Sequence, residues 1–351
     1  MRALQLITDR ELALSEVEPP PPPAAGEVQL RIRFVGLNHI DVWGLRGMAF
    51  AKRLYPLSVG AEASAEVLAV GPDVTNVVPG DRVVPFSALT CGICKACRRG
   101  RDNLCENVGG VRGFHVDGFA QDITNHPARL VVKIPDAVSL EDAACVAVAY
   151  STVEHMLFDN AHLEPEETVL VQAGASGIGT IAVKIAKSLG CTVIATAGSA
   201  DKCRACVALG AAHAINYREE DFVAVIKDKT GGEGVNVILD MVGGDYIQRN
   251  ISAAAPGGRI VNIAYQKGAT AEVNFGPLLR KRLSLLATTL RGRSNGEKGV
   301  IRDAVLKTVW PLIGSGRIKP VVDSRFSLAE AQKAHETMRN SGHIGKILLV
   351  S

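Results

Sequence analysis

The sequence contains the turn Gln172-Ala173-Gly174-Ala175-Ser176-Gly177-Ile178-Gly179, from which the fold of its second half follows. The turn comes after the apolar run Thr168–Gln172 and opens a segment with apolar residues at helical spacing, which leads to the apolar run Thr192–Ala197. A strand, a turn, a helix and a second strand form a βαβ unit with parallel strands. Small residues in such a turn let the backbone approach a pyrophosphate at the positive end of the helix. This context predicts a dinucleotide-binding site, with an ordinary strand-to-helix turn as the alternative. The residues predicted to bind there are Gly174, Ser176, Gly177, Ile178 and Gly179.

The alternation of strands and helices continues to residue 288. The expected strands are Ala214–Tyr217, Val235–Asp240, Arg259–Ala264 and Ser284–Thr288, and the expected helices are Asp201–Leu209 and Asp221–Lys229. Strands separated by helices pair in parallel through right-handed crossovers, so residues 150–289 are predicted to form an α/β domain with a doubly wound parallel sheet. An apolar strand at a sheet edge invites association. We therefore expect Ser284–Thr288 to pair with its copy in a homodimer or higher homo-oligomer, unless the C-terminal tail covers it.

The rest of the chain has a mostly β pattern. Short Val-rich runs among Gly and Pro, such as Val28–Phe34, Gly60–Val70 and Arg82–Pro85, predict strands. After residue 290 we expect helices at Lys298–Ile313 and Leu328–Arg339 and a strand at Lys346–Val350. This tail is predicted to fold back onto the first half, so that residues 1–149 and 290–351 form one domain.

Composition excludes several classes of protein. The chain has 351 residues, of which 47% are hydrophobic and 21% charged, as in ordinary globular proteins and unlike disordered ones. A net charge of +3 is too small for a chain of this length to favour nucleic acid as a partner. The run Ala143–Leu157 carries Glu154 and His155 and is shorter than the ~18 residues of a membrane span. The first ten residues lack a secretory pattern, so a cytoplasmic protein that acts on a small molecule is expected.

The second strand of the βαβ unit indicates which nicotinamide cofactor is bound. Enzymes that use NAD place an acidic residue about 20 residues after the glycine turn, where it binds the ribose 2′-hydroxyl. No acidic residue ends the run Thr192–Ala197, while Ser199, Lys202 and Tyr217 follow nearby and can bind a 2′-phosphate. These residues favour NADPH. The alternative is that Lys202 and Arg218 are ordinary solvated charges.

Four of the eight cysteines have the spacing of a metal site. Cys91, Cys94, Cys97 and Cys105 lie within fifteen residues, and four thiolates that fill a tetrahedral shell predict one structural Zn²⁺ per chain. A coincidental cluster or a redox pair is the alternative. A second C-x-x-C, at Cys203 and Cys206, lies inside a predicted helix and is interpreted as helix packing, and Cys145 and Cys191 as small core residues.

These motifs together resemble the medium-chain dehydrogenase/reductase superfamily from end to end. The cysteine segment, residues 91–105, is similar to the structural zinc lobe of the zinc alcohol dehydrogenases. Other motifs look like the quinone oxidoreductase branch: the glycine turn, Asp240–Gly244, Gly257–Arg259, Thr289–Arg293 and His343–Lys346. The resemblance implies a GroES-like catalytic domain of mostly β structure beside a Rossmann cofactor domain.

The chain departs from the zinc alcohol dehydrogenases at their catalytic metal. The positions that match its three ligands hold Asn38, Ala61 and Val148. Without a Lewis acid, oxidation of a simple alcohol loses its main source of stabilisation. A different metal site formed by His39, Asp41 and Glu62 is the alternative that the sequence leaves open.

The resemblance also implies roles for residues that, in the quinone oxidoreductases, line the cleft beside the nicotinamide. Asn38 and Asp41 would line the substrate pocket, with Asn38 donating a hydrogen bond to a substrate oxygen; an ordinary helix cap and a surface carboxylate are the alternatives. Thr152 and Ile263 are the further residues predicted to bind the cofactor. Where relatives often carry a tyrosine, the nearby aromatic residues here are Trp43 and Phe50, so the proton donor is not identified.

The sequence thus favours an NADPH-dependent oxidoreductase that transfers hydride to quinones or α,β-unsaturated carbonyls without a catalytic metal. Two alternatives stay open. One is a zinc-type alcohol or aldehyde dehydrogenase with an atypical site. The other is a non-catalytic NADPH-binding sensor or RNA-binding protein, because a fold does not fix a function.

Overall fold

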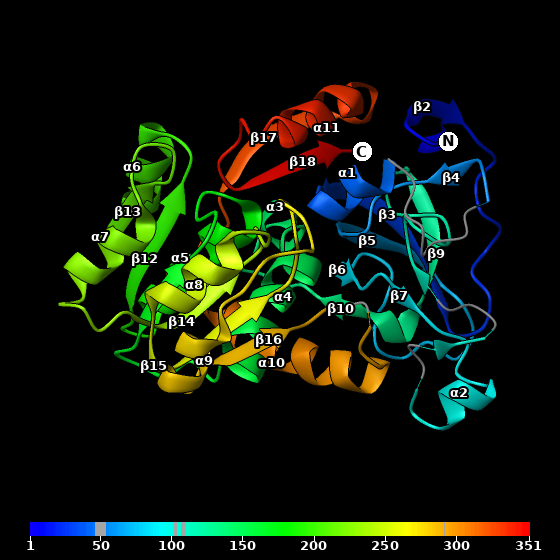
Figure 1. Cartoon of the computed structure of the whole chain (residues 1–351). Helices are drawn as coiled ribbons and strands as arrows, with labels where there is room; N and C mark the ends of the chain where they lie inside the picture. The colour runs from blue at the N-terminus through cyan, green and yellow to red at the C-terminus, as the bar shows by residue number, and fades with distance from the viewer. Residues whose placement is uncertain (46–53, 102–103, 107–109, 291) are drawn as a thin grey trace. The chain divides into compact units, whose positions relative to one another are not determined.

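The computed structural model describes residues 1–45, 54–101, 104–106, 110–290 and 292–351, and the chain divides into two compact units (Figure 1). Unit 1 consists of Met1–Ser151 and Arg291–Ser351, and unit 2 of Thr152–Leu290. Phe50, one of the aromatic residues noted in the sequence, lies outside the described residues. In the described ranges no helix has both the length and the apolar character that crossing a membrane requires.

Unit 2 contains a six-stranded sheet in which every pair of neighbours is parallel. The strand order is β13-β12-β11-β14-β15-β16, so the direction of winding reverses between β11 and β14. This order confirms the predicted doubly wound Rossmann sheet, and the reversal is where such sheets bind ligands. The strands are β11 (Thr168–Val171), β12 (Thr192–Ala197), β13 (His213–Asn216), β14 (Val235–Asp240), β15 (Ala254–Asn262) and β16 (Ser284–Ala287).

Helices follow the strands of this sheet (Figure 1). The unit has α4 (Ser151–Glu154, whose first residue belongs to unit 1), η4 (His155–Asn160), α5 (Gly177–Ser188), α6 (Ala200–Ala208), α7 (Phe222–Lys229), α8 (Tyr246–Ala253) and α9 (Phe275–Lys281). The apolar face predicted for α5 is buried, as Ala182 and Ile185 show. The sequence analysis missed α8, because the buried face of this helix includes the polar residue Asn250 between Ile247 and Ile251.

Unit 1 is built around a seven-stranded sheet of order β10-β6-β5-β3-β18-β17, in which β9 also pairs with β3. Two smaller sheets, β2-β1-β4 and β7-β8, complete its β structure. Alternating side chains of β3, such as Val28, Leu30 and Ile32, are buried in the core of the unit. The strands are β1 (Arg2–Thr8), β2 (Glu11–Glu16), β3 (Glu27–Gly36), β4 (Leu57–Ser58), β5 (Ala63–Val70), β6 (Arg82–Pro85), β7 (Ala88–Leu89), β8 (Gly110–Val111), β9 (Ile123–Pro127), β10 (Val131–Lys133), β17 (Val322–Ser327) and β18 (Lys346–Val350).

The helices of unit 1 are short except in the tail. They are α1 (His39–Leu45), α2 (Lys95–Arg98), η2 (Ala128–Leu130), α3 (Leu140–Ala143), η3 (Val146–Tyr150), α10 (Asn295–Gly314), η5 (Leu328–Glu330) and α11 (Ala331–Arg339). The predicted helix Leu328–Arg339 therefore begins with a 3₁₀ turn. The predicted strand Gly60–Val70 starts only at Ala63, because Gly60 has a φ of +94° that no extended residue adopts.

The tail returns to the first part of the chain. β18 pairs antiparallel with β3, where Leu349 lies opposite Val35, and parallel with β17 on its other side. The sequence analysis missed β17, whose sequence VDSRFS is mostly polar. Residues from both ends of the sequence thus form one sheet and one core.

Candidate functional site

The glycine turn of unit 2 leads from β11 into α5 and leaves no room for larger side chains. Ser176 caps α5, because its Oγ accepts a hydrogen bond from the backbone N–H of Gly179 at 2.9 Å. A Cβ atom on Gly174 would lie 2.7 Å from the Cβ of Ala195, and one on Gly179 would lie 2.2 Å from the carbonyl oxygen of Ala173. Both positions therefore require glycine. The first amides of α5, which have no acceptor within the helix, can bind an anion.

A series of hydrogen bonds among buried polar side chains supports this turn. The hydroxyl of Thr196 donates to Oε1 of Gln172 at 2.7 Å, and Nε2 of Gln172 donates to Oδ1 of Asn250 at 2.9 Å. The backbone N–H of Ala173 donates to the same Thr196 hydroxyl at 3.2 Å. Ala173 has a φ of +53°, a conformation that costs energy for a residue other than glycine. These bonds hold the backbone of the turn in this conformation.

The three residues predicted to bind the 2′-phosphate lie together at the carboxyl end of β12. Ser199 caps α6, and its Oγ accepts from the backbone N–H of Lys202 at 3.3 Å. Tyr217 lies against Gly198, since a Cβ atom on Gly198 would be only 2.6 Å from the tyrosine hydroxyl. The acidic residue nearest in sequence, Asp201, forms an ion pair with Arg204. A hydroxyl, an ammonium and a phenol are therefore available where NAD enzymes place a carboxylate.

Asp240 organises the carboxyl ends of β14 and β15. Its carboxylate is buried and accepts hydrogen bonds from the backbone N–H of Val242 at 2.7 Å and from Nδ2 of Asn262 at 2.7 Å. Burial raises the pKa of Asp240, and these bonds oppose the increase. The half-buried Ile263 comes directly after Asn262, and its backbone N–H donates to the Asp240 carbonyl at 3.1 Å. Thr152, the other residue predicted to contact the nicotinamide, lies in α4 and is half-buried.

Unit 1 contains a buried ion pair that the sequence analysis did not predict. Nζ of Lys346 lies 2.8 Å from Oε2 of Glu62, and both side chains are at most 2% exposed. The same ammonium donates to the carbonyl of Leu37 and to Oδ1 of Asn38, both at 2.8 Å. Oε1 of Glu62 accepts from the backbone N–H groups of residues 148 and 149 at 2.6 and 3.1 Å. Each charge is therefore paired and also hydrogen-bonded, which a buried ion pair requires.

This ion pair determines what Asn38 can do. Its Nδ2 donates to the Gly36 carbonyl at 3.2 Å and to Glu62 at 2.9 Å, and its Oδ1 accepts from Lys346. Both hydrogens of the Asn38 amide are thus used within the protein, and in this arrangement neither is left to donate to a substrate oxygen. Asn38 precedes α1, and its backbone N–H donates to Oδ2 of Asp41 in the first turn of that helix at 2.8 Å. Its side-chain contacts connect β3 with the ion pair.

Asp41 lies beside this network and is buried rather than at the surface, with 4% of its area exposed. Its Oδ2 accepts from the backbone N–H of Asn38 at 2.8 Å, while the structure records no hydrogen bond to Oδ1. Burial raises the pKa of Asp41 to about 7, and the ammonium of Lys346 opposes the increase. The neighbouring His39 has its pKa lowered to about 4, chiefly by burial. The pKa of Asp41 therefore lies close to neutral pH, while that of His39 lies below it.

The described residues do not support the alternative metal site at His39, Asp41 and Glu62. Within the described ranges, only Cys91, Cys94, Cys97 and Cys105 bring three or more potential metal ligands together. Glu62 has Lys346 as its partner instead. The three candidate ligands of the alternative site do not converge.

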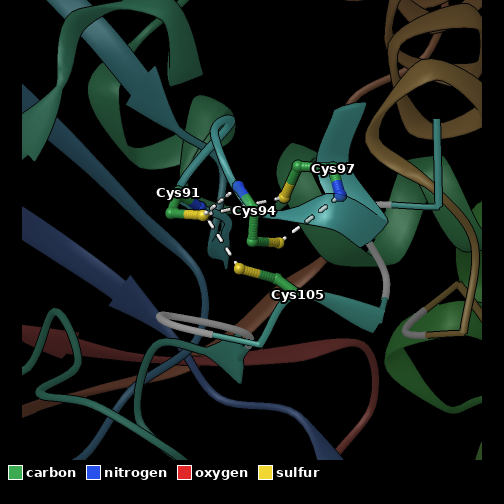
Figure 2. A group of neighbouring side chains, drawn as sticks. All are labelled: Cys91, Cys94, Cys97 and Cys105. Carbon is green, nitrogen blue, oxygen red and sulfur yellow. Dashed lines mark hydrogen bonds between the residues drawn. The ribbon is translucent and has the colours of Figure 1, made fainter. Parts of the chain in front are cut away.

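The four cysteines form a compact cluster at the start of α2 (Figure 2). All four Sγ atoms lie within 4.8 Å of one another, and those of Cys91 and Cys97 are 3.9 Å apart. A tetrahedral Zn²⁺ with Zn–S bonds of about 2.3 Å separates its sulfur ligands by about 3.8 Å. The cluster therefore has the size of a four-sulfur zinc site.

Backbone amides in this segment point at the sulfur atoms. The N–H groups of Cys91, Cys94 and Cys97 donate to the sulfur atoms of Cys105, Cys91 and Cys94 at 3.3, 3.3 and 3.5 Å. The amides of Cys97 and Glu106 lower the pKa of the Cys94 thiol, which favours the thiolate form that binds a metal. Four protein sulfur ligands leave no position open for substrate, so these residues fit a structural metal.

The chain matches two families along most of its length. The Alcohol dehydrogenase GroES-like domain matches residues 24–136, and the Zinc-binding dehydrogenase family matches residues 177–305. Quinone oxidoreductase-like protein 2 of Bos taurus is 33% identical over 344 residues, which cover 97% of this chain and 89% of the relative. Quinone oxidoreductase 1 of Escherichia coli (strain K12) is 32% identical, covering 94% and 93%. Acryloyl-coenzyme A reductase of Metallosphaera sedula is 28% identical, covering 94% of each.

Solved structures show the same similarity. The Escherichia coli quinone oxidoreductase complexed with NADPH has a TM-score of 0.82 and 29% identity, with all of both chains covered. An NAD-dependent alcohol dehydrogenase has a TM-score of 0.87 and 33% identity, again with all of both chains covered. Both kinds of oxidoreductase therefore share the fold of this chain.

Proposed function

The chain belongs to the medium-chain dehydrogenase/reductase superfamily and is an oxidoreductase, and we propose that it reduces quinones or α,β-unsaturated carbonyls with NADPH and without a catalytic metal. The similarity to quinone oxidoreductases and to acryloyl-coenzyme A reductase supports this class of acceptor.

The observation that carries the proposal is the chemistry around Glu62. Asn38, Ala61 and Val148 occupy the positions of the catalytic metal ligands in the zinc alcohol dehydrogenases, and none of them offers a thiolate, imidazole or carboxylate. The Glu62 carboxylate is fully bonded by Lys346, Asn38 and two backbone amides. This arrangement favours acceptors that need no Lewis acid, because a quinone or enone spreads the charge it gains onto its own oxygen.

The residues of unit 2 favour NADPH as the cofactor. The glycine turn offers backbone amides to the pyrophosphate, and Ser199, Lys202 and Tyr217 offer hydrogen-bond donors to the 2′-phosphate. Ile263 follows β15, in the half of the sheet assigned to the nicotinamide, and Thr152 is assigned to the nicotinamide by its match to relatives. When bound, the cofactor supplies the hydride.

In unit 1 we assign two site residues with different tasks. Asn38 positions the segment between β3 and α1 through its bonds to Glu62 and Lys346. Asp41 carries a carboxyl group that holds a proton up to about pH 7, which suits the protonation of the oxygen anion of the reduced acceptor. Its unbonded Oδ1 supports this assignment.

Three further parts of the proposal concern the protein as a whole. Cys91, Cys94, Cys97 and Cys105 hold one structural Zn²⁺ per chain, which fits the size and charge of the cluster. A homodimer forms along β16, which is the last strand of its sheet in the described structure and whose Leu285 is 41% exposed. A cytoplasmic location agrees with the free thiols of the chain.

Steady-state kinetics with the purified full chain test the proposal. Quinones, enones and benzyl alcohol are each offered with NADPH, NADH or the oxidised cofactors as appropriate. We expect turnover of quinones or enones with NADPH and poor oxidation of the alcohol. Efficient alcohol oxidation that a chelator abolishes without unfolding the protein would overturn the proposal in favour of a metal-dependent dehydrogenase. NADPH binding without any turnover would favour a sensor.

A further inference from the structure

His155 is a buried residue of unit 2 to which the proposed function assigns no role. It is the first residue of η4, a π-helical turn that follows α4, and only 4% of its surface is exposed. Single π-helical turns cost stability and occur often at functional sites. Nδ1 of His155 lies 2.8 Å from Oδ2 of Asp159, one turn later in the same segment. Nε2 lies 2.6 Å from Oγ1 of Thr288, which is 133 residues away in sequence.

The hydrogen-bond partners of His155 fix the orientation of its ring. Asp159 accepts the proton of Nδ1, so Nε2 is left as an acceptor for the Thr288 hydroxyl. The amide of Asn160 lies 3.2 Å from the same Nε2 and donates to the carbonyl of His155 at 2.6 Å. Both ring nitrogens thus have partners, and the ring cannot turn without breaking a bond to each.

Thr288 is the first residue after β16, at the carboxyl end of the sheet. Its backbone N–H donates to the carbonyl of Asn262 at 3.0 Å, directly before Ile263. In a doubly wound sheet, ligands bind outside the carboxyl ends of the strands, and the strands β14, β15 and β16 form the half that receives the second mononucleotide. The hydroxyl bonded to His155 therefore belongs to the strand end that borders the nicotinamide subsite.

We propose that His155 is a positioning residue for the nicotinamide half of the cofactor, and that it acts by holding Thr288, and with it the carboxyl end of β16, through the Asp159–His155–Thr288 chain of hydrogen bonds. This inference rests on the proposed use of a nicotinamide cofactor. The adenosine half of the same cofactor is assigned to β12, which lies on the other side of β11 from β16 in the strand order of the sheet. Loss of these hydrogen bonds should therefore weaken the binding of the nicotinamide half and leave the binding of the adenosine half unchanged.

The experiment compares two ligands in the full chain. NADPH occupies both halves of the site, whereas 2′,5′-ADP occupies the adenosine half alone. The variants are His155→Asn, which cannot reach Thr288, Thr288→Val, which removes the hydroxyl at similar volume, and Thr288→Ser, which keeps it. His162→Asn is the matched control, because His162 is exposed and its φ of +46° suits asparagine. Dissociation constants come from fluorescence titration, and melting temperature monitors folding.

We expect His155→Asn and Thr288→Val to raise the dissociation constant of NADPH roughly 5- to 10-fold, the loss of one hydrogen bond, and to leave that of 2′,5′-ADP within about twofold. Thr288→Ser should retain wild-type affinity for both ligands. The double variant should bind NADPH no more weakly than the single variants, since both remove the same bond. The turnover number with a quinone should fall by about 10- to 100-fold in His155→Asn, because misplaced reactants react slowly.

Two outcomes would overturn the inference. One is an unchanged NADPH affinity and turnover in a folded His155→Asn variant. The other is an equal loss of affinity for both ligands, which would show that His155 stabilises unit 2 as a whole. Failure of the wild type to bind 2′,5′-ADP would instead contradict the NADPH preference, and the comparison would then use NADH and AMP. The two proposals are therefore tested separately.

Discussion

Replacing Lys346 by methionine should strongly destabilise unit 1. The ammonium donates three hydrogen bonds, to Leu37, Asn38 and Glu62, each at 2.8 Å. Methionine has a similar length and no charge, so Lys346→Met would leave the Glu62 carboxylate without its counter-ion in a site where its exposed fraction is 0%. Two backbone amides and Asn38 would be its remaining donors. A buried charge without a counter-ion is the costly case, worth about 3–5 kcal/mol.

Tryptophan fluorescence measures this effect in the right part of the chain. Both tryptophans, Trp43 and Trp310, belong to unit 1, so thermal unfolding followed by their emission reports on that unit. For a unit of this size 1 kcal/mol corresponds to about 2–4 °C, so the expected decrease in melting temperature is roughly 6–20 °C. Lys307→Met, a substitution of an exposed lysine in α10, is the control. A double variant that adds Glu62→Gln removes the unpaired charge and should melt above Lys346→Met. The reasoning is refuted if Lys346→Met melts within about 2 °C of the control.

The remaining predictions concern the metal, the cofactor, the dimer and pH. Cys97→Ser should lower zinc content and melting temperature but change turnover per folded molecule by less than about twofold, because a closed four-sulfur site is structural; elemental analysis that finds no zinc in a wild type of full stability would contradict this. Lys202→Ala should weaken NADPH binding about 10- to 100-fold and leave NADH unchanged in fluorescence titrations, and equal wild-type affinities for the two cofactors would disagree with it. Leu285→Lys should produce monomers in light scattering at micromolar concentration, and a monomeric wild type would exclude the dimer. Asp41 has its pKa raised from 3.8 to about 7, so the folded state holds this proton more tightly than the unfolded state and loses stability as pH rises between those values. In urea unfolding, the free energy of unfolding of Asp41→Asn should therefore increase relative to that of the wild type between pH 4 and pH 8, by at most ~4 kcal/mol for ~3 pKa units. A difference between the two proteins that stays constant with pH would show that the pKa of this carboxyl is not perturbed.

The cofactor unit was largely predictable from its sequence because its signals are local. β12 and β14 have the predicted bounds, and the Ser176 cap begins α5 at the glycine turn. Each of these elements follows from the spacing of apolar residues or from a capping residue within a few positions. Parallel strands joined by right-handed crossovers then predict a doubly wound sheet.

The network around Glu62 could not be predicted in the same way. Glu62 and Lys346 are 284 residues apart, and neither residue type is expected in a core unless it is paired. Only the antiparallel pairing of β18 with β3 brings the lysine to Leu37 and Asn38. The hydrogen bonds of Asn38 to Glu62 and Lys346 could not be predicted either, because they depend on this distant lysine. The sequence nevertheless indicated such a partner, because a lysine at the start of an apolar strand requires a buried hydrogen-bond acceptor.

The position of β18 has a consequence for the synthesis of the protein. Unit 2 is continuous in sequence, so every residue of its sheet is synthesised before the tail of unit 1. Unit 1 is discontinuous, and β3 lacks one of its neighbours until residues 346–350 arrive. The same residues bring the ammonium that neutralises Glu62, so the earlier segment reaches its final hydrogen-bonded state last. During translation the nascent chain therefore contains all of the cofactor unit while the seven-stranded sheet of unit 1 is still incomplete. The incomplete sheet is the part that chaperones would meet.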